Sequence, residues 1–381
     1  MKVAIVHDWL VTYAGAERVL EQILLLYPEA DLYSLVDFMP EAERAFLRGR
    51  RPRTSFLQRM PFARRRYRAY LPLMPLAVEQ FDLSEYDLVI SSWNAVSKGV
   101  LTGPDTLHVC YCNSPFRYAW DLQHQYLRDG GLEHGVRSWL ARYILHRVRL
   151  WDYRTANGVD EFLVNSRYAG ERIRKYYRRD STVVYPPVDT ETFVPGTGER
   201  QDFYVAAGRM VPYKRLDLIA EAFTGMPHRR LLVLGDGPEM PRVRARSGPN
   251  VTLMGYQPAA VLREHLQRAR GFVIAGPEDF GIAAVEALAC GTPVIALRRG
   301  AVTETVRGPE DSKPTGIFFE AQTVASLQDG VERFEREAER YSAANCRESS
   351  LPFGVDRFRQ NFRREVGAAL ERFERHRGAR P

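Results

Sequence analysis

The stretch "GFVIAGPEDFGIAAVEALACGTPVIAL", residues 271–297, decides the fold class of this 381-residue chain. It begins with a short apolar run and continues through a loop that ends at Gly281. Apolar residues at helical spacing follow, and then a second apolar run. A strand, a loop, a helix and a second strand are typical of parallel sheets that helices cover on both faces. The stretch therefore predicts an α/β fold.

The same alternation runs through the rest of the chain. We interpret further apolar runs as strands, at residues 2–7, 88–92, 107–112, 161–166, 203–208, 230–235 and 251–255. Between them lie segments with helical spacing, such as 136–156. The pattern stops at 183–202, where three prolines and two glycines mark a connector.

These patterns predict two doubly wound, Rossmann-like domains. We expect an N-terminal domain at 1–187, a C-terminal domain at 188–353, and a helical segment at 354–381 that packs back toward the N-terminal domain. In open parallel sheets, ligands bind beyond the carboxyl ends of the strands. We therefore expect the functional site in a central cleft that the two domains face.

Composition restricts the class of protein. The chain is 45% hydrophobic and 27% charged, as in ordinary soluble domains, and it has no apolar run long enough to span a bilayer. The N-terminal apolar run is short and reaches Asp8 too soon for a secretory signal, so we expect a cytoplasmic protein. Cys110 and Cys112 lack the spacing of metal ligands with the other two cysteines, and we interpret them as packing residues.

The formal net charge of +7 favours acidic partners, and one segment concentrates the positive charge. Residues 48–70, "RGRRPRTSFLQRMPFARRRYRAY", contain nine arginines and no acidic residue, and aromatic residues are interleaved with them. A solvated helical face is one interpretation. Contact with an anionic membrane surface is the other, which would make the protein peripheral on the inner face of the cell membrane.

Two cations follow the strand expected at 203–208. Arg209 and Lys214 lie between the end of this strand and the first turn of the next helix. Two permanent charges at this position can hold the two phosphates of a pyrophosphate and balance the charge of a leaving group. The alternative is a pair of exposed cations on a loop.

Two carboxylates lie in the loop and helix at 277–290. Gly281 lets the backbone approach a ligand, and the amides of Phe280, Gly281 and Ile282 can donate to hydroxyls or phosphate. Glu278 can accept hydrogen bonds from a polyhydroxylated group. Each glutamate has a second interpretation as a helix-stabilising residue, but the apolar neighbours of Glu286 indicate burial, and a buried carboxylate needs a partner.

The motifs "GRMVPYKRLD", "LGDGPE", "NVTLMGY" and "PEDFGIAAVEALACGTPVIA" together resemble the retaining nucleotide-sugar glycosyltransferases of family 4, which have the GT-B fold. The resemblance covers nearly the whole chain, and its C-terminal half is the specific part. In the N-terminal half, "HDWLVTYAGAERV" and "CYCNSPFRYAWD" resemble the branch of bacterial O-antigen and exopolysaccharide mannosyltransferases that use GDP-mannose.

The resemblance implies roles for the donor-binding residues. Arg209 and Lys214 would bind the donor diphosphate and stabilise the leaving group, and Gly15 would lie against the diphosphate. Glu286 would hold the ribose, and Glu278 would hold the sugar. The remaining positions are the amides of the helix start for the sugar and two residues that border the base: Phe280, Gly281, Ile282, Gly255 and Tyr256.

The N-terminal half supplies the candidates for sugar or acceptor contacts. Asp8 ends the first strand, with a capping role as its alternative, and Arg117 and Tyr118 follow Pro115. The sequence departs from the family at Asn113, where the branch has histidine. Asparagine hydrogen-bonds a hydroxyl but exchanges no proton near neutral pH. A front-face mechanism, in which the leaving phosphate takes the acceptor proton, does not require a side-chain base.

We therefore expect a retaining hexosyltransferase of polysaccharide biosynthesis, such as lipopolysaccharide synthesis, that moves mannose from GDP-mannose onto a glycan or polyprenyl-pyrophosphate-linked acceptor. Because the chain has no Asp-x-Asp pair, we expect no metal and no cofactor beyond the nucleotide-sugar. A UDP-linked glucose, galactose or N-acetylhexosamine is the alternative donor. A basic nucleic-acid-binding protein is the remaining alternative, although no recognised nucleic-acid module is present.

Overall fold

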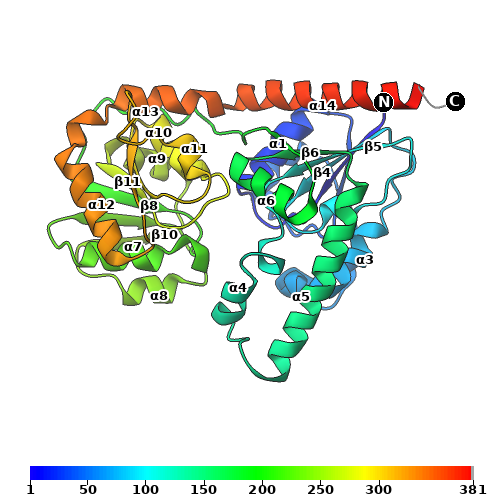
Figure 1. The fold of residues 1–381 in the computed structure, drawn as a ribbon, viewed down its shortest axis with the longest axis horizontal. Helices are drawn as coiled ribbons and strands as arrows, with labels where there is room; N and C mark the ends of the chain where they lie inside the picture. Colours follow the sequence, from blue (N-terminus) through cyan, green and yellow to red (C-terminus); the bar gives the residue numbers. More distant parts are fainter. Residues whose placement is uncertain (379–381) are drawn as a thin grey trace. The chain divides into compact units, whose positions relative to one another are not determined.

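The computed structural model describes residues 1–378, and the predicted segment at 354–381 therefore has its last three residues outside the described part. The described chain forms two compact units (Figure 1). Residues 1–187 and those from Phe358 on make the first unit, and residues 188–357 make the second. The division at Pro187 falls inside the proline-rich connector.

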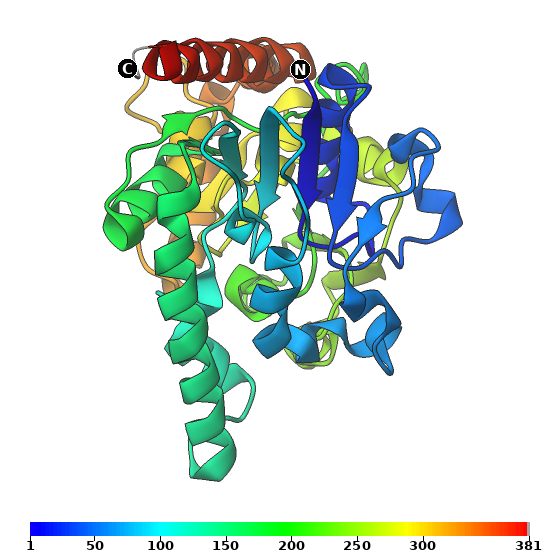
Figure 2. The same cartoon turned by 90° about the vertical axis from the view of Figure 1, so that its right-hand side faces the viewer.

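The first unit is built on a sheet of seven parallel strands in the order β3-β2-β1-β4-β5-β6-β7 (Figure 2). The strands are β1 (Val3–His7), β2 (Asp31–Ser34), β3 (Arg53–Thr54), β4 (Leu88–Trp93), β5 (Leu107–Cys112), β6 (Glu161–Val164) and β7 (Thr182–Val183). Its helices are α1 (Gly15–Leu26), α2 (Ala63–Arg66), α3 (Met74–Glu79), α4 (Gln123–Asp129), α5 (Gly135–Thr155), α6 (Arg167–Tyr177) and, from Phe358 on, α14 (Val355–Gly378).

Helices cover both faces of this sheet. Along β1, Val3 and Ile5 join one apolar cluster with residues of α1 and α14, whereas Ala4 and Val6 join another with residues of α3, α5 and α6. Both sets are buried because successive side chains of a strand point to opposite faces. On the α14 side, Phe358 packs its ring against Tyr111 of β5 at a centroid distance of 5.8 Å.

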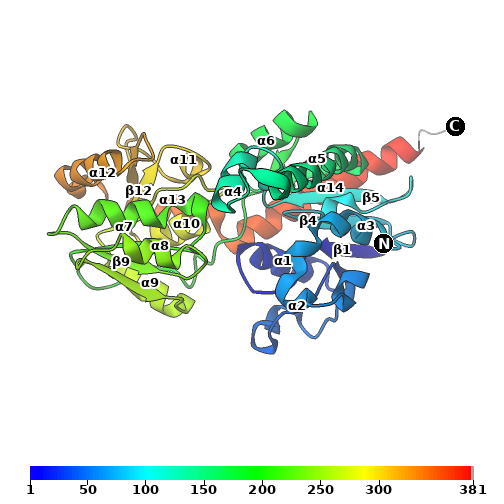
Figure 3. The ribbon, with the colours of Figure 1, turned by 90° about the horizontal axis from the view of Figure 1, so that it is seen from below.

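The second unit repeats the architecture with six parallel strands in the order β10-β9-β8-β11-β12-β13 (Figure 3). The strands are β8 (Phe203–Ala207), β9 (Arg230–Leu234), β10 (Val251–Gly255), β11 (Gly271–Ile274), β12 (Val294–Leu297) and β13 (Gly316–Phe319). The helices are α7 (Leu216–Thr224), α8 (Met240–Ala245), α9 (Ala259–Arg268), α10 (Ile282–Ala289), α11 (Val302–Thr305), α12 (Val324–Arg336) and α13 (Ala343–Ser350). Residues of α7, α8 and α12 belong to one core cluster, and residues of α9, α10, α11 and α13 belong to the other.

The predicted α/β class with two doubly wound sheets is confirmed, and the strands that apolar runs indicated are present. Four strands have no counterpart in the prediction: β2, β3, β7 and β13. β3 and β7 are two residues long, and β2 is a run of only four with polar residues at both ends. Such short runs give too little periodicity to distinguish a strand from a loop.

The cysteines are free and buried. Cys110 and Cys112 lie on the same face of β5 and pack in the apolar cluster beneath α3, α5 and α6, which confirms their interpretation as packing residues. Burial raises the pKa of the Cys110 thiol to about 12, so it stays protonated near neutral pH. Among residues 1–378, the structure contains no helix with the length and apolar character needed to cross a membrane.

Candidate functional site

The sheet order of the second unit marks where a ligand would bind. β8 lies between β9, which follows it in the chain, and β11, which the chain reaches only after β10. The strand order therefore reverses between β8 and β11, and such switch points are the binding sites of doubly wound sheets. The loops that leave these two strands carry Lys214 and Glu278.

Lys214 and Glu278 form an ion pair across the switch point. The ammonium nitrogen of Lys214 lies 3.0 Å from Oε1 of Glu278, and the two side chains are only 19% and 16% exposed. Lys214 ends the short 3₁₀ helix Pro212–Lys214, and Arg215 after it has a left-handed conformation with φ of 53°. The predicted diphosphate-binding cation and the predicted sugar-binding carboxylate are thus direct neighbours.

Three glycines bring the loops after β8, β9 and β10 into backbone contact. The amide of Gly235 donates to the carbonyl of Gly255 at 2.7 Å. A Cβ atom at Gly235 would lie 2.0 Å from the carbonyl oxygen of Gly208, and one at Gly208 would lie 2.8 Å from Nζ of Lys214. The approach at Gly235 leaves no room for a side chain, and Gly208 and Gly255 have positive φ angles of 143° and 69° that favour glycine. A continuous chain of contacts therefore connects the predicted base-binding segment at Gly255 to Lys214.

Two more glycines hold the loop that carries Glu278. A Cβ atom at Gly276 would lie 2.3 Å from the carbonyl oxygen of Tyr213, so the loop after β11 runs against the backbone beside Lys214. On the other side, the carbonyl of Glu278 accepts a hydrogen bond of 3.0 Å from the amide of Ala301. Gly300, with φ of 91°, packs directly on the Glu278 backbone. The position of Glu278 is fixed by backbone contacts on both sides.

The loop that carries Glu278 ends at Gly281, directly before helix α10. The φ of 85° at Gly281 is a left-handed conformation that glycine adopts without strain, and α10 starts at the next residue, Ile282. Phe280 is buried with its ring 5.5 Å from that of Phe353. Glu286 lies in α10 and is 3% exposed, so the predicted burial of this carboxylate is correct. Burial, followed by the charge of Glu286, raises the pKa of the Cys290 thiol to about 12.

Two predicted donor-binding residues project to the surface of the second unit. Arg209, directly after Gly208, is exposed. Tyr256 is 79% exposed and follows Gly255, whose φ of 69° turns the chain at the end of β10. Arg209 follows β8 at the switch point, whereas Tyr256 follows β10 at the edge of the sheet.

In the first unit, Asp8 binds the backbone of its own domain. The carboxylate is 1% exposed, and each of its oxygens accepts two backbone amides of the loop after β4. Oδ2 accepts from Asn94 and Ala95 at 2.6 and 2.8 Å, and Oδ1 accepts from Val96 and Ser97 at 2.8 and 2.7 Å. The geometry is that of the capping role, which was the alternative to acceptor contact.

The other candidates in the first unit lie in the loops after β5 and β1. Nδ2 of Asn113 donates to the hydroxyl of Ser92 at 3.2 Å, so its amide faces the end of β4. Arg117 and Tyr118 lie in the short 3₁₀ helix Arg117–Ala119, and burial raises the pKa of the Tyr118 phenol. Gly15 is the first residue of α1, which starts in the loop after β1.

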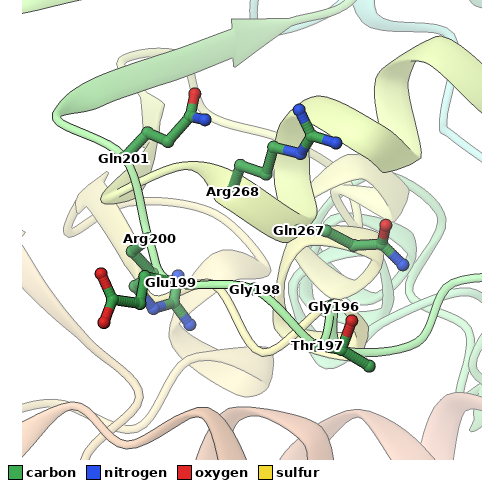
Figure 4. Close-up of a pocket in the computed structure, with 8 residues that line it drawn as sticks. All are labelled: Gly196, Thr197, Gly198, Glu199, Arg200, Gln201, Gln267 and Arg268. Carbon is green, nitrogen blue, oxygen red and sulfur yellow. The ribbon is translucent and has the colours of Figure 1, made fainter.

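One cavity of about 620 Å³ lies elsewhere in the second unit (Figure 4). Its walls come from the connector before β8 and from the end of α9, and they contain no predicted site residue. The lining residues are Gly196, Thr197, Gly198, Glu199, Arg200, Gln201, Gln267 and Arg268. We assign no role in the candidate site to this cavity.

The sequence did not identify the glycines that shape the site. Gly208, Gly235, Gly276 and Gly300 each pack backbone on backbone, and none was among the predicted site residues. The motif "LGDGPE" adds one more such glycine. Gly237 in this motif packs on the backbone of Met210 next to Arg209, so the motif supports the predicted diphosphate loop. Over residues 1–378, no cluster of three His, Cys, Asp or Glu side chains forms a candidate metal site.

The two doubly wound units and their switch-point loops define a glycosyltransferase fold of the GT-B class. Solved structures similar over nearly the whole chain include Anabaena HepE in complex with UDP, with a TM-score of 0.69 over 97% of this chain and 100% of that one. Sucrose-phosphate synthase from Thermosynechococcus elongatus has a TM-score of 0.71 with the same two coverages. Sequence identity is 16% in both comparisons, so they show the fold alone.

The sequence comparisons give the family. Residues 14–192 match the model of glycosyltransferase family 4, and residues 187–349 match the model of the group 1 glycosyl transferases. The chain therefore belongs to the family 4, group 1 glycosyltransferases, as the sequence motifs predicted.

Curated relatives match over part of their length. A D-inositol 3-phosphate glycosyltransferase from Mycobacterium sp. is 31% identical over 177 residues, which cover 39% of this chain and 39% of the relative. A GDP-mannose-dependent alpha-(1-6)-phosphatidylinositol dimannoside mannosyltransferase from Mycobacterium tuberculosis is 28% identical over 194 residues, which cover 45% of this chain and 51% of the relative. The chain thus spans about half or less of the length of these relatives.

Proposed function

We propose that the protein is a retaining hexosyltransferase that moves mannose from GDP-mannose onto a glycan or lipid-linked oligosaccharide in polysaccharide biosynthesis. The observation that carries the proposal is the ion pair of Lys214 and Glu278 at the switch point of the second sheet. Lys214 supplies a cation for phosphate, and Glu278, 3.0 Å away, supplies an acceptor for hydroxyls. These two groups match the diphosphate and the sugar of a nucleotide-sugar.

The glycine contacts support the same assignment. At Gly208, Gly235 and Gly276 the backbones of neighbouring loops are in close contact, so these loops cannot easily move. Lys214 and Glu278 are therefore held in place before a ligand arrives. Preorganised charges stabilise a developing negative charge without reorganisation at the moment of reaction. This is what departure of a nucleoside diphosphate requires.

The proposed step is a displacement on one face of the sugar. The bond between the anomeric carbon and the diphosphate oxygen breaks, and a bond from the same carbon to the acceptor hydroxyl oxygen forms. The hydroxyl proton passes to the departing diphosphate oxygen, so no side-chain base is needed and Asn113 is compatible with the reaction. Lys214 and Arg209 balance the charge on the diphosphate, and Glu278 and the start of α10 orient the sugar.

The choice of donor is the finer part of the proposal. The Mycobacterium tuberculosis relative is named as GDP-mannose-dependent, and the motifs of the first unit resemble GDP-mannose enzymes. The second candidate donor is a UDP-sugar, which the UDP complex of the similarly folded HepE favours. We also propose that no divalent metal is required, and that the arginines of segment 48–70 contact an anionic membrane that carries the acceptor.

The test measures donor hydrolysis and thermal stabilisation with GDP-mannose and with a panel of UDP-sugars, all in the presence of EDTA. Wild type is compared with Lys214→Ala, Glu286→Ala and the matched control Lys313→Ala, which removes an exposed lysine of the same unit. We expect a response to GDP-mannose alone that is lost in the first two variants and kept in the control.

The other outcomes are equally informative. A response to a UDP-sugar alone would overturn the assignment of GDP-mannose as the donor. It would leave the fold and the roles of Lys214 and Glu286 unchanged. A requirement for added Mg²⁺ or Mn²⁺ would overturn metal independence. If no donor were hydrolysed and none stabilised the protein, and the protein bound nucleic acid in a salt-sensitive way, the assignment as an enzyme would be overturned.

A further inference from the structure

Helix α5 of the first unit exposes an apolar stripe. Val136, Trp139, Leu140 and Tyr143 occupy positions i, i+3, i+4 and i+7, which lie on one face of a helix. Val136 is 83% and Trp139 is 68% exposed, and the other two are half exposed. A stripe at this spacing usually packs on a core, and here it faces solvent. We call these four residues the α5 stripe.

The helix does not need the α5 stripe for its own folding. Its C-terminal half is anchored by other residues: Val148 is buried in the core, and Arg149 donates to the carbonyl of Ala119 at 2.6 Å. The N-terminal end of α5, with α4 beside it, extends beyond the sheet of its unit (Figures 1 and 2). Within the α5 stripe, the rings of Trp139 and Tyr143 stack at 5.8 Å with an interplanar angle of 7°. The exposed surface is therefore a preformed aromatic face at the end of a rigid helix.

The charge around the α5 stripe is positive. Residues 134–151 contain four arginines and no acidic residue, and Arg137, Arg142 and Arg147 are exposed. The nearest exposed carboxylate along the chain is that of Glu133, at the connection to α4. A helix with aromatic and aliphatic residues on one side and arginines beside them is typical of the boundary between lipid headgroups and acyl chains.

A second surface of the same unit has the same composition. In segment 48–70, Phe62 is exposed on a left-handed turn just before α2, and Arg64, Arg65 and Arg66 in α2 are exposed after it. Aromatic side chains beside clustered arginines again match an anionic bilayer, whose surface attracts each cation. This charge complementarity selects a bilayer rather than a neutral protein surface as the partner of the α5 stripe.

We propose that α5 is a membrane-surface helix whose stripe inserts into the headgroup region of an anionic bilayer, with Arg137, Arg142 and Arg147 against lipid phosphates. The helix lies on the surface and does not span the bilayer. The proposal does not depend on the identity of the donor or the acceptor, because it concerns only side chains outside the candidate site.

The first experiment is cosedimentation of the full chain with vesicles of phosphatidylcholine and with vesicles that also contain phosphatidylglycerol. We expect partitioning onto the anionic vesicles and about a tenfold loss in the double variant Trp139→Ser, Leu140→Ser, because two large apolar side chains no longer insert. Leu101→Ser is the matched control, since Leu101 is an exposed leucine of the same unit, and it should keep wild-type partitioning.

A second readout follows Trp139 itself. Addition of anionic vesicles should shift the tryptophan emission of wild type to shorter wavelength, and Trp139→Phe should abolish the shift while partitioning stays within about threefold of wild type, because phenylalanine still inserts. Equal partitioning of wild type and the double variant would overturn the proposal. The proposal would also be overturned if the variant Arg64→Glu, Arg65→Glu, Arg66→Glu lost binding while the double variant of the α5 stripe bound like wild type. A concentration-dependent dimer that depends on Trp139 would identify a second copy of the chain as the partner and would overturn it too.

Discussion

Lys214 Nζ and Glu278 Oε1 lie 3.0 Å apart although the two residues follow different strands, β8 and β11. Both side chains are mostly buried, and the ion pair places an opposite charge beside each of them. A diphosphate that arrives at Lys214 would compete with the carboxylate for the ammonium group and leave Glu278 to accept from sugar hydroxyls. On the proposed function, the pair would couple recognition of the phosphate to recognition of the sugar.

Removal of the ammonium group tests this coupling. Lys214→Ala should lower the rate of donor hydrolysis or transfer about a hundredfold, because a preorganised positive charge at the leaving group is lost. The GDP affinity, measured by titration calorimetry, should fall as well. Lys313→Ala removes a lysine that pairs with Glu348 on the surface of the same unit, and it should leave both quantities unchanged. An unchanged rate in Lys214→Ala would contradict the assignment.

The close packing at Gly276 gives a test that keeps every charged group. Gly276→Ala would place a Cβ atom 2.3 Å from the carbonyl oxygen of Tyr213 and 2.7 Å from Cα of Lys214. Neither atom belongs to a flexible side chain, so the two loops must separate, and GDP should bind about tenfold more weakly. In the control Gly198→Ala, the added methyl group has no atom within 4 Å and should have no effect on GDP binding. Equal affinities for both variants would show that the loops tolerate the separation.

The sequence predicted the parts of the molecule that depend on periodicity and on local motifs. Apolar runs identified β1, β4, β5 and β6 in the first sheet, and five of the six strands of the second. The loop and helix from Glu278 to Glu286 were recognised because a glycine at a helix start and carboxylates near it form one local pattern. What the sequence did not contain was the partner of each residue. The contacts of Gly208 with Gly235, and of Asp8 with residues 94–97, join segments far apart in the chain, and only the fold brings them together.

A variant of Asp8 can distinguish a structural role of this carboxylate from contact with an acceptor. Asp8→Asn leaves one side-chain oxygen for four backbone amides and turns an NH₂ group toward donors, so the free energy of unfolding should fall by about 3 kcal/mol in urea denaturation. Asp82→Asn, at an exposed carboxylate of the same unit, should keep the wild-type midpoint. If Asp8→Asn lowered transfer without any loss of stability, the acceptor role would replace the capping role.

His108 predicts how stability depends on pH. Its Nδ1 donates to the carbonyl of Gly158 at 3.1 Å, its Nε2 accepts from the hydroxyl of Ser91 at 2.9 Å, and burial lowers its pKa to about 4. Above pH 6.5 the side chain is neutral in both the folded and the unfolded chain. As the pH falls from 6.5 to about 4, only the unfolded chain takes up the proton, so stability decreases.

Protonation of His108 in the unfolded chain should lower the free energy of unfolding by about 3 kcal/mol at pH 4. Urea denaturation of wild type and His108→Gln over this pH range measures it, because glutamine can make both hydrogen bonds but does not titrate. The stability of the variant should change less steeply with pH than that of wild type. Parallel curves for the two proteins would show that His108 contributes nothing to the pH dependence.

Lys98 is a fully buried cation in the first unit, with two hydrogen-bond acceptors and one carboxylate around its ammonium group. Nζ lies 2.9 Å from Oδ1 of Asp152 and donates to the carbonyl of Asp152 at 2.6 Å and to the hydroxyl of Thr155 at 2.7 Å. It also lies 5.0 Å from the ring centroid of Trp93 and 5.2 Å from that of Tyr177. In a low dielectric, removal of one partner of such an ion pair strongly destabilises the protein, since the other partner remains as an uncompensated charge.

Lys98→Met should therefore lower the free energy of unfolding by about 3–5 kcal/mol, whereas Lys175→Met, at an exposed lysine on α6, should change it little. The double variant Lys98→Met, Asp152→Asn should recover part of the loss, because Trp120 and Tyr177 can still donate to the neutral amide oxygen. Chemical denaturation of wild type, Lys98→Met, Asp152→Asn and the double variant gives the coupling free energy of the pair. If the double variant were no more stable than Lys98→Met, the loss would come from packing of the lysine stem among the aromatic rings rather than from an unpaired carboxylate.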